Sequence, residues 1–236
     1  MDLEILATLK SPEEIKKYVD QVIEEVINST KHEDVIGWEH TTPHKGFIDK
    51  NTTISNVDSY CKIDSNRYAY LYAAGLSKNK ITNLATASNL IYSFIVRYFG
   101  LDGDEEKRQQ IYQKSNTQIP DISVLEGKNC AVCAERAALA QNLFSLLGYE
   151  TYYIVGNVNN YPHAFNVINV NGRYLLYDAS KDVPVKVDGK ITGYNYYSAV
   201  LSDEQVEKLF NGEIIETIGK RTYQSFGKYN LGKTKQ

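Results

Sequence analysis

The sequence predicts an α+β protein, with helices in the first two thirds of the chain and an antiparallel sheet after them. Before Gly148, apolar residues recur every three or four positions, which is typical of helices. After Gly148 the period changes to two, which is typical of strands. The 236 residues contain no internal repeat and no low-complexity linker. We therefore expect one compact domain with an N-terminal helical elaboration.

Composition excludes several classes of protein. The chain has 42% hydrophobic and 23% charged residues, as folded globular proteins do, and its formal charge is −3. That balance provides no general attraction for nucleic acid. No apolar run is long enough to cross a bilayer, and the opening residues lack the basic flank and apolar run of a signal peptide. We expect a cytoplasmic protein with no membrane partner, and three cysteines argue against a disulfide scaffold.

The first 80 residues are predicted to form a helical and irregular extension. A helix is expected over about 12–28, where Ser11 and Glu14 form a capping box and Pro12 occupies the first helical position. From about 30 to 80 glycines and prolines interrupt short runs, which predicts irregular structure with room for a strand.

Residues 81–225 are predicted to form the core, beginning with three helices. The first covers about 82–99 and ends at Gly100, and a short charged helix follows around 104–114. The third runs from Cys130 to Leu147 and consists largely of small and apolar residues. We expect it to be the buried central helix.

Strands follow over 150–157, 163–170 and 173–178, and a further pair is expected to turn at Asp188-Gly189. Asn171-Gly172 is a strong signal for a two-residue hairpin. Ser202 begins a short helix to about residue 209 with a Ser-x-x-Gln cap. Residues 226–236 are predicted to be a frayed basic tail.

Three residues could together perform thiol chemistry. A cysteine can cleave or transfer an acyl group if it is ionised, if an imidazole carries the proton, and if a third group orients that imidazole. Cys133, His163 and Asp178 occur in this order. Cys133 lies in the first turn of the predicted central helix, where the helix dipole favours a thiolate and free N–H groups could bind an oxyanion.

The hairpin turn predicts that two of these residues meet. If Val170 pairs with Arg173, then His163 lies opposite Ser180, and Asp178 becomes the diagonal neighbour of His163 on the same face of the sheet. Asn166, the alternative orienting residue, would point to the opposite face. A slip of one residue in the turn would turn Asp178 away.

These segments resemble the core of the transglutaminase-like superfamily over residues 127–180. That family has a cysteine opening a helix, His-Ala-Trp on a strand, and Asp followed by Pro or Ala and then Thr or Ser on the next strand. The sequence departs from the pattern at Ala131, where glycine is typical, and at Phe165, where tryptophan is typical. The matching segments here are Cys133 with Ala137, Leu139 and Leu147-Gly148, then His163-Ala164-Phe165, then Leu176-Tyr177-Asp178-Ala179-Ser180.

The resemblance implies a papain-like core, with a central helix packed on an antiparallel sheet, and a Cys133-His163-Asp178 triad that works through a thioester. It implies acyl transfer or amide hydrolysis on a protein or peptide, with water or an amine as acceptor and no cofactor or metal. The family includes cross-linking enzymes, peptidases, deamidases, glycoprotein amidases and inactive members. A catalytically inactive interaction module therefore remains an alternative, and the oligomeric state is open.

Cys130 offers competing interpretations. It could replace Cys133 as the nucleophile, but its sixth helical position would then be Arg136, where the family pattern expects an apolar residue. Cys130 and Cys133 could also form half a zinc site or a redox pair. Structural zinc usually needs four ligands, and a redox motif would follow a strand that is missing here. We therefore favour a structural thiol at Cys130.

Overall fold

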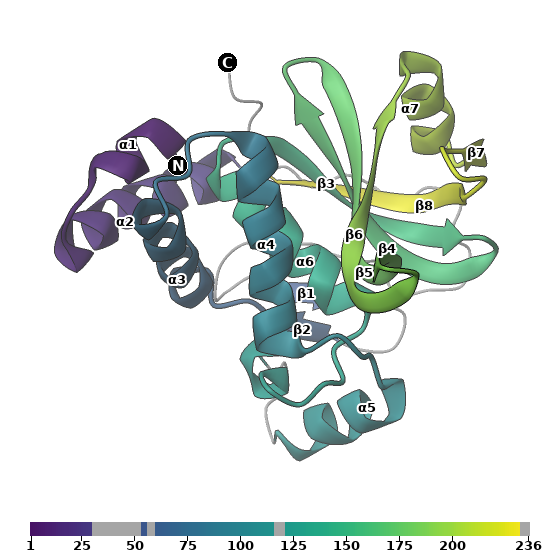
Figure 1. The fold of residues 1–236 in the computed structure, drawn as a ribbon, viewed down its shortest axis with the longest axis horizontal. Helices are drawn as coiled ribbons and strands as arrows, with labels where there is room; N and C mark the ends of the chain where they lie inside the picture. The colour runs from purple at the N-terminus through teal and green to yellow at the C-terminus, as the bar shows by residue number, and fades with distance from the viewer. Residues whose placement is uncertain (30–52, 56–59, 116–120, 232–236) are drawn as a thin grey trace.

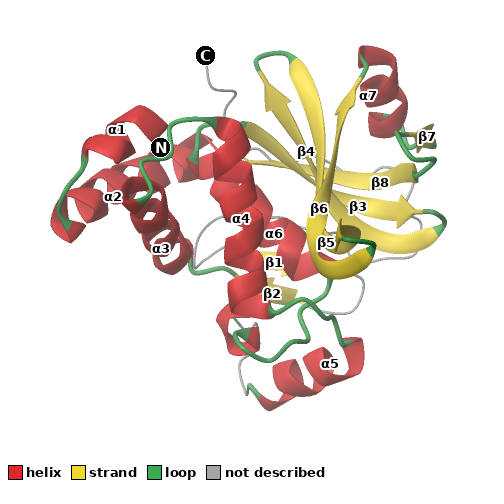
Figure 2. Cartoon of the chain, viewed as in Figure 1, coloured by secondary structure: helices red, strands yellow, loops and turns green. Residues whose placement is uncertain are grey.

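The computed structural model describes residues 1–29, 53–55, 60–115 and 121–231 (Figure 1). It confirms a mixed α+β fold, with α1 to α6 on one side and a curled antiparallel sheet, joined by α7, on the other (Figure 2). The elements are α1 (Leu3–Thr8), α2 (Pro12–Ser29), β1 (Thr53–Ser55), β2 (Tyr60–Lys62), α3 (Ser65–Lys78), α4 (Leu84–Phe99), α5 (Glu105–Lys114), the 3-10 helix η1 (Ile122–Leu125), α6 (Cys133–Leu146), β3 (Glu150–Val158), β4 (Tyr161–Val170), β5 (Arg173–Val187), β6 (Lys190–Leu201), α7 (Asp203–Phe210), β7 (Ile215–Glu216) and β8 (Thr222–Leu231).

The predicted helices 12–28, 82–99 and 104–114 correspond to α2, α4 and α5. At the start of α2, Ser11 Oγ accepts from the Glu14 N–H and the Glu14 carboxylate accepts from the Ser11 N–H, which confirms the capping box. The central helix begins at Cys133, three residues later than predicted, and every residue from Ala134 to Leu146 is buried. Its burial on all sides explains why small residues dominate its sequence.

Helix α3 corrects the prediction of irregular structure up to residue 80. Asp64 caps it by accepting from the Arg67 N–H at 3.2 Å, and Tyr68, Tyr72 and Leu76 are buried at helical spacing. The alternation of tyrosine with small and apolar residues imitates a strand, but these rings pack between helices. The sequence suggests surface positions for His32, His40 and His44 and assigns no role to Trp38; all four lie outside the described residues.

The main sheet has six antiparallel strands in the order β6-β5-β4-β3-β8-β7. β4 and β5 pair from Val170 with Arg173 to Asn166 with Tyr177, which is the predicted register. Asn171 and Gly172 both have positive φ, 54° and 82°, as a two-residue hairpin turn requires. β5 extends to Val187, well beyond the predicted end, and turns at Asp188-Gly189 into β6.

The predicted frayed tail begins too early. β8 runs to Leu231 and pairs with β3 along its length, so residues 226–231 belong to the sheet. The five basic residues of 219–236 suggested a solvated segment, but only Lys228 of them lies within 226–231. A strand between two neighbours needs only its backbone to pair. Residues 232–236 lie outside the described residues.

Two buried clusters lie on opposite faces of the sheet. On one face Ala164, Ile168 and Tyr177 pack with the helices, and this cluster joins residues from α1 through α6. On the other face Phe165, Val167 and Leu176 pack with residues of α7 and β8. Alternation along β4 thus produces two cores, and the candidate site lies where α6 meets this strand. Within the described part of the chain, no helix is long and apolar enough to span a membrane.

Candidate active site

Cys133 is the first residue of α6 and is partly exposed. The preceding residue, Val132, has extended backbone geometry, and its N–H donates to the Glu135 carboxylate at 3.1 Å. The first N–H groups of a helix have no partner within the helix, and the dipole gives this end a partial positive charge. Cys133 therefore lies at a helix end that attracts negative charge.

His163 and Asp178 meet as the hairpin register predicts. His163 Nε2 lies 2.9 Å from Asp178 Oδ2, and Asp178 is fully buried. The other carboxylate oxygen accepts from the Ser180 N–H at 3.0 Å, while Ser180 Oγ lies 3.3 Å from His163 Nε2. Both carboxylate oxygens are thus occupied, so the carboxylate is fixed toward the imidazole.

The His163 imidazole also reaches Cys133. Burial alone would lower the pKa of His163, but the charges of Asp178 and Cys133, and hydrogen bonds to both, raise its pKa well above the usual value. Burial would raise the pKa of Asp178, but His163 and Ser180 lower its pKa below the ordinary value. Since Nε2 faces Asp178, Nδ1 is the ring nitrogen left for the thiol. The structure thus brings Cys133, His163 and Asp178 together.

Asn166 faces the other side of the sheet, as predicted. Its Nδ2 donates to the Ala137 carbonyl of α6 at 2.9 Å. This contact fixes β4 against the helix that carries Cys133, but it leaves Asn166 away from the imidazole. Asp178 is therefore the residue that orients His163.

Cys130 occupies a different environment from Cys133. It is fully buried and precedes α6, and burial raises the pKa of its thiol. Cys130 and Cys133 are both free thiols. Among the described residues, no group of three His, Cys, Asp or Glu side chains is placed to hold a metal ion. Cys61 lies in β2, opposite Ile54.

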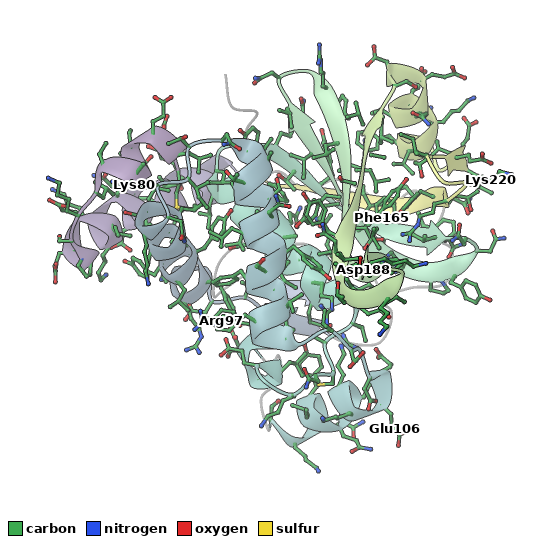
Figure 3. The ribbon with its side chains drawn as sticks, viewed as in Figure 1. Lys80, Arg97, Glu106, Phe165, Asp188 and Lys220 are labelled. Atoms are coloured by element: carbon green, nitrogen blue, oxygen red, sulfur yellow. The ribbon has the colours of Figure 1, made fainter. Side chains whose placement is uncertain are left out.

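The sequence pattern did not predict a buried ion pair between Arg108 of α5 and Glu135, which follows Cys133 by two residues in α6. Arg108 Nε donates to Glu135 Oε1 at 2.6 Å, and the Tyr112 hydroxyl donates to the same oxygen at 3.0 Å. The exposed fractions of the Arg108 and Glu135 side chains are 1% and 0%. Two signals were available in the sequence: an acidic residue inside an otherwise small and apolar helix, and Arg108 and Tyr112 on one helical face. Figure 3 shows the ordinary arrangement for comparison: the charged Glu106 of α5 lies at the surface, and the apolar Phe165 lies within the sheet.

Arg136 connects the start of α6 to the loop after α4. Its Nη2 donates to the Gly100 carbonyl at 2.6 Å and its Nε donates to the Ala131 carbonyl at 3.2 Å. The side chain is 3% exposed. The loop at Gly100 is therefore held against the segment that leads into Cys133.

Comparison with known proteins finds no protein family whose profile matches this chain and no curated protein with a significant sequence match.

Proposed function

We propose that the protein is a thiol-dependent acyltransferase or amide hydrolase that acts on a protein or peptide substrate, built on a papain-like core of the transglutaminase-like kind. The observation that carries this proposal is the hydrogen-bonded His163–Asp178 pair in contact with a cysteine at a helix N-terminus. The packing of α6 against β3, β4 and β5 also fits such a core.

In the first half of the reaction, the Cys133 thiolate attacks the substrate carbonyl carbon and forms a C–S bond. The carbonyl oxygen becomes an oxyanion near the free N–H groups at the start of α6. The His163 imidazolium then gives its proton to the leaving amine as the C–N bond breaks. The products are a thioester on Cys133, a free amine and a neutral imidazole.

In the second half, His163 accepts a proton from water or an amine as that group attacks the thioester. The C–S bond breaks, and the thiolate and imidazolium are restored. Asp178 stabilises the imidazolium in both halves, since its buried carboxylate stays charged and fixed by Ser180. General acid–base transfer by a residue in the position of His163 contributes roughly a hundredfold to ten-thousandfold in rate.

The test uses p-nitrophenyl acetate, an activated ester that requires no knowledge of the natural substrate. We expect release of p-nitrophenolate together with an acetyl group on the peptide that contains Cys133, found by mass spectrometry. Cys133→Ala should abolish the adduct, and His163→Ala should slow its formation by about a hundredfold. The matched control is Cys130→Ala, which removes the neighbouring thiol and should leave acetylation unchanged.

Acetylation that occurs at Cys130, or that is equally fast in the wild type and the His163→Ala variant, would contradict the proposal. Absence of acetylation on a folded wild-type protein would favour the inactive interaction module instead.

A further inference from the structure

A cleft of about 610 Å³ lies between α4 and the β5–β6 hairpin. Figure 2 shows the hairpin beside this helix. One wall contains Tyr92 and Val96 of α4 and then Leu101, and the other contains Gly193, Tyr194 and Asn195 of β6. None of these residues takes part in the proposed reaction. The cleft is therefore a feature separate from the Cys133, His163 and Asp178 side chains.

Both walls lead to the candidate active site. Leu101 lies between Gly100 and Asp102, whose carbonyls accept from Arg136 three residues after Cys133. On the opposite wall, Asp178 pairs with Tyr197, only two positions along β6 from Asn195. Two strand residues span roughly 7 Å. The cleft thus runs between the segment held by Arg136 of α6 and the strand next to the His163–Asp178 pair.

Tyr196 connects the two walls. Its ring packs on Tyr92 at 5.8 Å and on Tyr177 at 4.6 Å between centroids. Its hydroxyl donates to Asn89 Oδ1 at 3.0 Å, and its N–H donates to Asn195 Oδ1 at 2.9 Å. Since Tyr196 engages both amide oxygens, the Nδ2 groups of these asparagines are the parts that can serve a ligand, and they are donors.

Residues 193 to 195 of β6 line the cleft, and so does Val185 of β5, which pairs with Gly193. Side chains alternate along a strand, so the cleft is bordered by β6 together with one face of the hairpin. Among the described strands β6 pairs with β5 alone and forms the outer edge of the sheet. An exposed edge can pair with an extended polypeptide by adding a strand. Amide donors for carbonyl groups and apolar walls for side chains suit the same ligand.

We propose that this cleft binds the acyl-donor polypeptide in an extended conformation along the edge of β6, so that its reactive carbonyl reaches Cys133. The inference deepens the proposed function and rests on it. The edge of β6 supplies main-chain pairing, and Tyr92, Val96 and Leu101 hold an apolar side chain of the substrate.

Gly193 allows a sharp test. A Cβ added there meets no atom within 4 Å, so a side chain at this position begins in open space at the wall of the cleft. Two probes that alkylate the same thiol are compared in wild type and Gly193→Phe: iodoacetamide, which needs no cleft, and acetyl-Ala-Ala-Phe chloromethyl ketone, which does. We expect Gly193→Phe to slow the peptidyl probe at least about tenfold, which is 1.4 kcal/mol, and to leave iodoacetamide labelling unchanged.

The matched control is Val187→Phe, which places the same side chain at a 54% exposed position of the hairpin outside the cleft. It should leave both probes unaffected. Asn195→Ala is the second variant: it removes one amide donor without adding bulk and should slow the peptidyl probe about threefold to tenfold. Equal peptidyl rates in wild type, Gly193→Phe and Asn195→Ala would overturn the cleft proposal.

A binding measurement separates failure of this proposal from failure of the proposed function. Acetyl-Ala-Ala-Phe-amide is titrated into 15N-labelled protein, and the amide signals of residues 193–195 are followed. Shifts that Gly193→Phe removes support the cleft even if Cys133 proves unreactive. If Cys133 is activated but the peptide shifts no β6 signal, the cleft proposal is wrong and the proposed function stands.

Discussion

Two buried acid–base pairs in the described part of the chain, Arg108–Glu135 and His163–Asp178, differ in what they leave accessible. Arg108 and Glu135 lie 2.6 Å apart with side chains 1% and 0% exposed, and the second oxygen of Glu135 caps the Val132 N–H. His163 and Asp178 lie 2.9 Å apart, but the imidazole is 16% exposed and contacts Cys133. Both carboxylate oxygens of Glu135 accept hydrogen bonds from the protein. In the second pair, Nε2 of His163 faces Asp178, and Nδ1 is left for the Cys133 thiol.

The difference distinguishes a pair suited to a structural role from a pair suited to the proposed proton transfer. When one partner of a buried ion pair is removed, the other charge stays buried without compensation. The free energy of unfolding therefore falls. An accessible imidazole can accept and donate a proton, so its removal is expected to lower the reactivity of the Cys133 thiol. Proximity to Cys133 alone does not distinguish them, because Glu135 lies on the same helical turn.

The largest expected effect is on stability. Glu135→Ala leaves Arg108 buried without its main partner, and breaking such a pair costs about 3–5 kcal/mol of unfolding free energy. Urea denaturation followed by circular dichroism measures this. The control is Glu105→Ala, which removes a 46% exposed partner of Arg108 and should cost no more than about 1 kcal/mol. Equal losses in the two variants would contradict a structural role for the buried pair.

The second prediction concerns the pH dependence of stability. The pKa of His163 is raised in the fold, so its contribution is complete below the ordinary value of 6.5 and is lost as pH rises through the raised pKa. The pKa of Asp178 is lowered, so its contribution is present above 3.8 and is lost as pH falls through the lowered pKa. The pair should therefore stabilise most between these two ordinary values.

We expect the stability difference between wild type and a His163→Gln, Asp178→Asn double variant to be largest in that window and to shrink toward alkaline pH. Urea denaturation across a pH series measures this difference. A difference that grows steadily as the pH becomes alkaline would show that the imidazole is not held as a cation.

A smaller effect is expected at Ser180. Ser180→Ala removes the hydroxyl beside His163 but keeps the backbone N–H that binds Asp178. Loss of one hydrogen bond of about 0.5–1.5 kcal/mol should slow iodoacetamide labelling of Cys133 at about pH 6 by roughly twofold to tenfold. Ser180→Thr retains the hydroxyl and should label at the wild-type rate. Identical labelling rates in the wild type and both variants would show that the Ser180 hydroxyl does not affect the reactivity of Cys133.

Much of the candidate site could be predicted because one short turn sets a register. Asn171-Gly172 fixes Val170 opposite Arg173, and that pairing brings His163 to Asp178 and turns Asn166 toward α6. Periodicity likewise predicts α2 and α4, and a Ser-x-x-Gln cap predicts α7. These are local signals, each contained within about 20 residues of sequence.

Other features depend on contacts that local signals do not specify. The tyrosines of α3 have strand-like composition, and only packing against α4 decides for a helix. Arg108 lies on a charged helix that resembles a solvated one, and its partner Glu135 is 27 residues away in sequence. The basic residues over 219–236 suggested a solvated tail, but β8 contains only Lys228 of them, and its place is set by pairing with β3. In each case tertiary packing overrides the local pattern.

The most direct test of the central claim is the pH dependence of iodoacetamide labelling, with peptide mapping to compare Cys133 and Cys130 in the same molecules. An unperturbed thiol titrates near roughly 8.5, and an activated one reacts well below that. The proposed Cys133–His163 pair predicts that Cys133 labels fast at about pH 6, that Cys130 does not, and that His163→Ala removes the difference. Slow labelling of both cysteines with one ordinary pH profile, unchanged by His163→Ala, would contradict it.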